Sequence, residues 1–243
     1  GGNLNNHIGV PLTLLGLRDN HDFALIEMGA NKPGDIQELC EIADPTHGLI
    51  TNIGMAHIEG FGSKDGVVQT KSEMYRYIIK KEGVLLVNNN EPYLLPLTEN
   101  YPHCIEYGKG SQLDFELKAN DSKLEFSIDG RLIKTNLFGK YNANNALTAY
   151  VVGKQFAVET SKIVDALEQY VPTNNRSQIK NSDKGNRLIL DAYNANPSSM
   201  NLAIDELLLQ KGERLFILGD MKELGAVSEE EHKKVIKKIT EAG

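Results

Sequence analysis

The sequence predicts an α/β protein with a mostly parallel sheet, a small antiparallel sheet appended to it, and a partial Rossmann-like domain at its C-terminal end. Three observations predict this class. Apolar runs alternate with helical spacing over residues 23–88, the pattern changes to period two from about residue 103 to 138, and strand and helix alternate again after residue 187. A polar stretch at residues 172–178 interrupts the pattern. We therefore expect two domains, residues 1–172 and 173–243.

Strands and helices alternate through the first half of the chain. Short apolar runs predict buried strands at residues 23–28, 48–53 and 84–88. Helical spacing predicts helices at residues 33–42, with Pro33 near the start, and at residues 67–80. Repeated strand, helix and strand are typical of a parallel sheet covered by helices.

Alternating apolar and polar residues predict three antiparallel strands next, at 114–118, 123–128 and 131–137. Asp121-Ser122 and Asp129-Gly130 supply the hairpin turns between them. The remaining pattern predicts helices at 143–156, 161–170, 198–210 and 229–240, and strands at 187–191 and 214–219.

Bulk properties exclude several classes of protein. The net charge of -7 gives no electrostatic footprint for nucleic acid, and no apolar run reaches the ~18 residues of a membrane span. Cys40 and Cys104 are far apart and lack metal-site spacing, which indicates a reducing compartment. The chain opens without a Met or a signal sequence. We interpret it as an internal piece of a longer cytoplasmic protein and expect a monomer.

Two polar residues follow neighbouring predicted strands. Glu27 ends the first strand, and His57 follows the glycine-containing end of the second. Ligands bind outside the carboxyl ends of parallel strands, where carboxylate oxygens suit Mg²⁺. The simpler interpretations are a solvated carboxylate before a turn and a packed or surface histidine.

Lys71 lies in a predicted helix, two residues before Glu73. Its simplest interpretation is a solvated helix lysine. A cationic lysine beside Mg²⁺ would be repelled, whereas a desolvated neutral lysine could add carbon dioxide and become an anionic carbamate. Spacing alone does not distinguish these states.

Two further polar groups stand at helix starts. Asn142 and Asn145 are three residues apart and share one helix face, so their amides could pair with an adenine edge, although spacing alone favours N-capping by Asn142 and a polar helix face. A strand-to-helix turn around Pro197 gathers the second group, and its free backbone N–H groups would suit an anion. A simple capped turn is the alternative for this group, which comprises Asp191, Asn194, Asn196 and Ser198.

Several segments, spread in order over almost the whole chain, together resemble the ATP-dependent Mur ligases. They include the opening Gly-Asn-Leu-Asn-Asn-His-Ile-Gly and the turn Asp-Ala-Tyr-Asn-Ala-Asn-Pro-Ser-Ser-Met. The full set comprises residues 2–15, 26–31, 45–54, 56–63, 191–200 and 218–225. Within the family they are most similar to members that add D-alanyl-D-alanine to UDP-N-acetylmuramoyl-tripeptide, because other members typically have His where Asn194 stands.

The resemblance implies a role for each candidate residue. Glu27 and His57 would hold Mg²⁺, and Lys71 as a carbamate would support a second Mg²⁺. Asn142 and Asn145 would contact the adenine of ATP, Arg176 its phosphates and Asp191 its ribose. The amine substrate would lie toward Asn194, Asn196 and Ser198, and the first substrate toward Asn5, Asn6 and His7. Two residues depart from the family pattern: Tyr141 replaces a frequent His, and Asn175 replaces a common Gly.

The implied reaction is peptide ligation in cytoplasmic peptidoglycan precursor synthesis. A carboxylate of the UDP-linked tripeptide attacks the γ-phosphate of ATP, and the amine of D-alanyl-D-alanine then attacks the acyl phosphate, releasing ADP and phosphate. The chain contains no Gly-x-x-x-x-Gly-Lys-[Ser/Thr] loop. We therefore expect residues 1–243 alone to be inactive. Another ligase of the Mur or folylpolyglutamate type and a non-catalytic nucleotide-binding module are the alternatives.

Overall fold

A computed structural model describes residues 4–54, 58–118 and 123–241 of the chain. It divides into two units, Gly1–Glu106 and Tyr107–Gly243. The division predicted between residues 172 and 173 lies inside the second unit and remains a proposal. No helix among the described residues is both long and apolar enough to cross a membrane.

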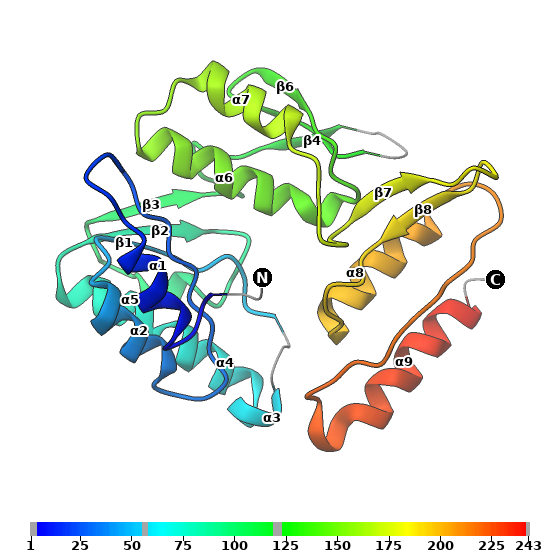
Figure 1. Cartoon of the computed structure of the whole chain (residues 1–243), viewed down its shortest axis with the longest axis horizontal. Coiled ribbons are helices and arrows are strands. Elements are labelled where there is room, and N and C mark those ends of the chain that lie inside the picture. Colours follow the sequence, from blue (N-terminus) through cyan, green and yellow to red (C-terminus); the bar gives the residue numbers. More distant parts are fainter. Residues whose placement is uncertain (1–3, 55–57, 119–122, 242–243) are drawn as a thin grey trace. The chain divides into compact units, whose positions relative to one another are not determined.

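A three-stranded sheet with the order β1-β2-β3 forms the centre of the first unit (Figure 1). Strand β1 (His47–Leu49) pairs in parallel with β2 (Val84–Asn88), with His47 opposite Val84. This register confirms the predicted parallel pairing, and β2 matches its predicted range. The strand predicted at residues 48–53 was wrong in its extent, because β1 ends at Leu49. The period-two pattern from about residue 103 did not single out β3 (Cys104–Tyr107), which joins this sheet and not the antiparallel one.

Helices cover this sheet. Helix α5 (Glu73–Lys80) lies against β1 and β2, and α2 (Asp35–Ala43) packs on α5 (Figure 1). Tyr75 and Ile78 of α5 join the apolar core with Leu85 and Val87 of β2. The remaining helices of the unit are α1 (Gly9–Leu15), α3 (Ile58–Phe61), α4 (Lys64–Lys71) and the 3₁₀ turn η1 (Leu95–Leu97).

The predicted helix over residues 67–80 is two helices, α4 and α5, with Ser72 at their junction. The Ser72 hydroxyl donates to the Gln69 carbonyl at 2.9 Å and accepts from the Arg76 guanidinium at 2.9 Å. A serine hydroxyl that bonds backward to a helix carbonyl bends the helix. The prediction of one continuous helix was therefore wrong, because the helix is interrupted at Ser72.

The prediction of a strand at residues 23–28 was wrong, because the structure has no strand there. Leu25 is 90% exposed and Phe23 is 61% exposed, so only the end of this run, Met28, packs against a core cluster. A strand needs a neighbour to satisfy its N–H and C=O groups. Among the described residues no strand pairs with this segment.

The second unit begins with the predicted antiparallel sheet, in the order β4-β5-β6. Its strands are β4 (Glu116–Lys118), β5 (Glu125–Ile128) and β6 (Arg131–Lys134). Asp129 and Gly130 have φ of 50° and 71°, as the tight turn between β5 and β6 requires, which confirms that hairpin. The other predicted turn, at Asp121-Ser122, lies outside the described residues.

Two helices accompany this sheet, α6 (Ala143–Gln155), which follows the 3₁₀ turn η2 (Lys140–Asn142), and α7 (Thr160–Gln169) (Figure 1). Helix α7 packs on β6, where the Glu168 carboxylate accepts a hydrogen bond from the Lys134 N–H at 3.0 Å. Both helices lie within about two residues of their predicted bounds, which is the usual uncertainty of helix ends.

The chain ends in a strand hairpin and two helices. Strand β7 (Gln178–Asn181) pairs antiparallel with β8 (Arg187–Leu190), and α8 (Pro197–Leu208), the 3₁₀ turn η3 (Gly225–Val227) and α9 (Ser228–Glu241) follow. The sequence did not predict β7, which is mostly polar. The strand predicted at residues 214–219 was wrong, because that segment has no strand partner among the described residues and Ile217 is 88% exposed.

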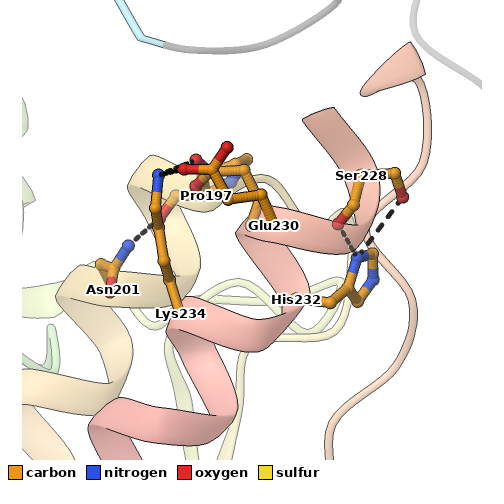
Figure 2. A network of polar contacts seen from close by, with 7 residues as sticks. Pro197, Asn201, Ser228, Glu230, His232 and Lys234 are labelled. Carbon is orange, nitrogen blue, oxygen red and sulfur yellow. Dashed lines mark hydrogen bonds and ion pairs between the residues drawn. The ribbon is translucent and has the colours of Figure 1, made fainter. Parts of the chain in front are cut away.

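Polar contacts fix the helices at this end (Figure 2). His232 Nδ1 lies 2.7 Å from the Ser228 carbonyl of the same helix, and its Nε2 accepts from the Met221 N–H at 3.0 Å. These contacts assign a neutral imidazole protonated on Nδ1, which ties the segment before η3 to α9. Met221 is thereby placed in the apolar core of α8 and α9, with Ile204, Leu224 and Val235.

Candidate functional site

The first unit presents a group of charged side chains at the carboxyl ends of β1 and β2. Because these strands are parallel, their ends share one edge of the sheet, where ligands bind in open α/β folds. Lys71, the last residue of α4, donates from Nζ to the Asn52 carbonyl at 2.7 Å. The Glu91 carboxylate, from the turn after β2, accepts from the Ile53 N–H at 3.2 Å. The peptide group between Asn52 and Ile53 is thus held on both sides by charged groups.

Burial affects the charge of Lys71. It lowers the pKa of the Lys71 ammonium group, and the negative charge of Glu91 opposes the shift. A lowered pKa increases the fraction of neutral amine, the form that can add carbon dioxide. The fully solvated lysine of the simplest interpretation is therefore not what the structure shows, because Lys71 is half-buried and bonded to the backbone.

Glu27 lies beside Asn5. The Asn5 amide donates to Glu27 Oε1 at 2.9 Å, and the Asn5 carbonyl accepts from the Gly29 N–H at 2.7 Å. A Cβ on Gly29 would lie 2.8 Å from the Asn5 amide nitrogen, so a larger residue there would displace the Asn5 side chain. The sequence did not predict this pairing of the opening segment with the residues around Glu27.

Asn6 and His7, the other two candidate residues of the opening motif, do not contact Glu27 through the hydrogen bonds described for Asn5. The Asn6 side chain accepts from the N–H groups of Ile8 and Gly9, at 3.1 Å and 2.9 Å, and so stabilises the turn before α1. His7 is exposed. Asn5 is therefore the member that the structure brings to Glu27.

A magnesium site here is compatible with the residues but incomplete in the described part of the chain. Glu27 offers an exposed carboxylate, and Mg²⁺ commonly uses one or two protein carboxylates with several waters. Lys71 fits such a site only as a carbamate, because an ammonium group has no lone pair to offer. His57 lies outside the described residues, and these contain no cluster of three or more His, Cys, Asp or Glu side chains arranged for a metal.

Glu73 is a residue whose contacts the sequence did not predict. Its carboxylate accepts from the Gly34 N–H at 2.8 Å and from the Gln37 N–H at 3.0 Å. These are unpaired donors at the start of α2, where the helix dipole also favours a negative charge. Glu73 thereby connects the helix after Lys71 to the segment that follows Glu27.

The second unit brings the two predicted adenine residues together. The Asn145 amide donates to Asn142 Oδ1 at 3.2 Å, and the Asn142 amide donates to the Phe138 carbonyl at 2.7 Å. Asn142 is buried and forms no side-chain cap of α6, so N-capping does not explain it. Asn145 is exposed, and Asn142 positions it.

Residues 175–177 lie beside residues 191–193. The Ser177 N–H donates to Asp191 Oδ1 at 3.0 Å, and the Ala192 N–H donates to the Asn175 carbonyl at 2.8 Å. The Arg176 guanidinium stacks on the Tyr193 ring, 3.7 Å from its centre. Arg176 and Asp191, predicted on separate segments, are thus adjacent.

The surroundings of Asp191 act on its pKa in opposite directions. Burial raises the pKa of the Asp191 carboxyl, while the hydrogen bonds from Ser177 and the charge of Arg176 oppose that shift. A partly buried carboxylate between a backbone donor and a guanidinium group can accept hydrogen bonds from hydroxyl groups. This is the chemistry expected of a ribose-binding residue.

The turn before α8 is a capped helix start. Asn196 accepts from the Ser199 N–H at 2.9 Å in a reciprocal capping box, and Pro197 occupies the predicted first turn. Asn194 Oδ1 accepts from the Ala195 N–H at 2.9 Å. Ser198 is half-buried in the first turn of α8. Capping therefore accounts for Asn196 without a ligand.

The comparison with family models covers most of the chain. Residues 1–153 match the model described as the Mur ligase middle domain, and residues 175–243 match the Mur ligase, glutamate ligase domain. The two matches leave residues 154–174 between them. This interval contains residues 172–174, the beginning of the polar stretch predicted as the linker.

Individual relatives give the same result. The chain is 36% identical to the UDP-N-acetylmuramoyl-tripeptide–D-alanyl-D-alanine ligase of Bacillus subtilis, over 96% of this chain and 52% of that protein. The enzyme of the same name from Haemophilus influenzae is 36% identical, with the same two coverages of 96% and 52%. The chain therefore spans about half the length of the curated relatives it matches.

Solved structures agree in fold. MurF from Acinetobacter baumannii superposes with a TM-score of 0.90 at 33% identity, covering 99% of this chain and 54% of that one. MurF from Thermotoga maritima, solved in complex with ADP, gives a TM-score of 0.82 at 26% identity, covering 98% and 57%. Because a family model matches residues 1–153, more than half of the 243 residues, the chain belongs to the Mur ligase family.

Proposed function

We propose that the complete protein to which this chain belongs is an ATP-dependent ligase that joins D-alanyl-D-alanine to UDP-N-acetylmuramoyl-tripeptide in peptidoglycan precursor synthesis. One observation carries the proposal: ligases of that name match this chain over 96% of its length at 36% identity. The ADP complex of the Thermotoga maritima neighbour supports ATP as the nucleotide. A cytoplasmic location and a monomeric state are further expectations of the resemblance.

Residues of the second unit would bind the nucleotide. Asn145, positioned by Asn142, would pair with the adenine edge, and Asp191 would accept hydrogen bonds from the ribose hydroxyls. Arg176 would contact the phosphates, since a planar guanidinium binds phosphate oxygens in pairs. Its stacking on Tyr193 limits the positions that its guanidinium can take. Asn194, Asn196 and Ser198 would lie toward the incoming amine, and Asn196 would do so while capping α8.

Residues of the first unit would act on the phosphate side. Glu27 and His57 would hold Mg²⁺, which neutralises the negative charge that develops during phosphoryl transfer. Lys71 as a carbamate would provide oxygen ligands for a second ion, which its lowered pKa supports. Asn5 would orient Glu27 through their 2.9 Å hydrogen bond, and Asn6 and His7 would lie toward the UDP-linked substrate.

The amine substrate is tested by measuring ADP release from the complete protein with Mg-ATP and UDP-N-acetylmuramoyl-tripeptide. We expect D-alanyl-D-alanine to accelerate release at least tenfold more than D-glutamate, diaminopimelate or L-glutamate does. Acceleration by one of those other amines would assign a different ligase of the superfamily. Absence of both ADP release and Mg-ATP binding by calorimetry would favour a non-catalytic module.

A further inference from the structure

Tyr141 departs from the family pattern, and the structure gives it a specific partner. Its hydroxyl lies 2.7 Å from the Ser177 hydroxyl, across 36 positions of sequence. Tyr141 belongs to the 3₁₀ turn η2 that leads into α6, directly before Asn142. Ser177 lies directly after Arg176 and is 6% exposed. One hydrogen bond thus links the neighbours of two predicted nucleotide-binding residues.

Ser177 also contacts Asp191, a third predicted nucleotide-binding residue. Its backbone N–H donates to Asp191 Oδ1 at 3.0 Å, so its backbone and side chain hold two different segments. The residue therefore lies where the η2 turn, the loop around Arg176 and the end of β8 meet.

The backbone of this loop needs such support. Asn174, Asn175 and Ser177 have φ of 58°, 55° and 48°, in the left-handed region that costs side chains other than glycine free energy. A conformation of this kind persists only where surrounding contacts determine it. The contacts of Ser177 with Tyr141 and Asp191, and of Asn175 with Ala192, meet that requirement.

We propose that Tyr141 and Ser177 form a positioning pair that keeps Arg176 and Asp191 in a fixed arrangement with Asn145 and the buried Asn142 that positions it, so that one nucleoside polyphosphate contacts Asn145, Arg176 and Asp191. This rests on the proposed nucleotide site of the second unit. Tyr141 and Ser177 touch no reacting atom; they set how strongly the nucleotide binds, because an arrangement fixed before binding removes the cost of ordering the loop.

The matched control is another tyrosine of the same unit. The Tyr150 hydroxyl of α6 donates to Asp129 at 2.7 Å, a bond of the same length that ties α6 to the β5–β6 turn. Tyr150→Phe removes a comparable hydroxyl contact without touching the loop around Arg176. Any effect that comes only from a weakened fold should appear equally in Tyr141→Phe and Tyr150→Phe.

The experiment measures ADP affinity by calorimetry, and KM for ATP and kcat, in the complete protein with each variant. We expect Tyr141→Phe and Ser177→Ala each to weaken ADP binding and raise KM about three- to tenfold, with kcat changed less than about twofold. The double variant should be no weaker than either single variant, because both remove the same contact. Tyr150→Phe should bind ADP as the unaltered protein does.

The outcomes separate this proposal from the one it rests on. If the unaltered protein binds no ADP, the proposed nucleotide site is wrong. If the unaltered protein binds ADP and Tyr141→Phe and Ser177→Ala bind it equally well, the positioning pair alone is overturned. Equal weakening by Tyr150→Phe, or fully additive losses in the double variant, would also overturn it.

Discussion

At the residue scale, Tyr141 makes stability depend on pH in alkali. Burial raises the pKa of its phenol to about 12. In the unfolded chain the phenol loses its proton near pH 10, so between about pH 10 and 12 the folded state binds more protons and stability falls as pH rises. We expect the free energy of unfolding of Tyr141→Phe to fall less steeply than that of the unaltered protein in this range, as measured by urea denaturation.

Tyr150 provides a comparison for that measurement. Burial also raises the pKa of its phenol to about 12, so Tyr150→Phe should flatten the same part of the profile. Indistinguishable slopes for the unaltered protein and both variants between pH 10 and 12 would show that these hydroxyl groups titrate alike in the folded and unfolded states.

Asp191 makes stability depend on pH in acid. Burial raises the pKa of its carboxyl, so the folded state retains this proton to higher pH than the unfolded state does. The associated stability is complete below the unfolded pKa and is lost as pH rises through the folded pKa. Asp191→Asn keeps an oxygen acceptor for the Ser177 N–H but does not titrate. Relative to the unaltered protein, it should gain stability from pH 3 to pH 7, as urea midpoints would show.

The same variant separates stability from binding. Asp191→Asn should bind ADP more weakly than the unaltered protein at pH 7, although its stability relative to that protein is higher at pH 7 than at pH 3. If the stability of Asp191→Asn relative to the unaltered protein does not rise between pH 3 and pH 7, burial does not raise the pKa of the Asp191 carboxyl.

At the scale of elements, the cap of α8 distinguishes a structural from a substrate-binding role. Asn196 accepts from the Ser199 N–H, and loss of such a cap typically costs about 1 kcal/mol. We expect Asn196→Ala to lower the free energy of unfolding by about that amount, and Asn196→Asp, which can still cap, to restore it. Asn194→Ala is the control, since the Asn194 side chain accepts from its neighbour Ala195 and does not cap α8. Equal stability of Asn196→Ala and Asn194→Ala would contradict the cap.

The elements also show what the sequence can predict. β2, the β5–β6 hairpin and helices α6 to α9 were predicted because their apolar spacing or turn residues are local signals. The segments at residues 23–28 and 214–219 have the same apolar pattern but no strand partner among the described residues. Pairing is a property of two segments, so no pattern within one of them could reveal it.

The candidate site was predicted only where residue type and position were enough. The structure places Asn142 beside Asn145, and Ser177, the neighbour of Arg176, beside Asp191, while the roles of these residues remain a proposal. The contacts of Glu73, Glu91 and Ser177 were missed, because a side chain that binds a distant backbone group leaves no periodic signal. The contact of Tyr141 with Ser177 was missed too, because the sequence showed only that Tyr141 departs from the family pattern.

At the scale of the whole molecule, the proposed activity depends on more than these 243 residues. The sequence has no Gly-x-x-x-x-Gly-Lys-[Ser/Thr] loop to bind the β- and γ-phosphates, and the chain spans about half of its curated relatives. We expect residues 1–243 alone to release no phosphate from ATP above background, and the complete protein to do so when both substrates are present. Robust ligation by residues 1–243 alone would contradict this dependence.

The central claim is that the complete protein activates a carboxylate by phosphorylating it with ATP. Its most direct test uses UDP-N-acetylmuramoyl-tripeptide with ¹⁸O in the terminal carboxylate, together with Mg-ATP and D-alanyl-D-alanine. When the carboxylate attacks the γ-phosphate, one of its oxygens becomes bonded to phosphorus, and it leaves with the phosphate when the amine forms the amide. We predict one ¹⁸O atom in each released phosphate by mass spectrometry; ligation product accompanied by unlabelled phosphate would contradict the account.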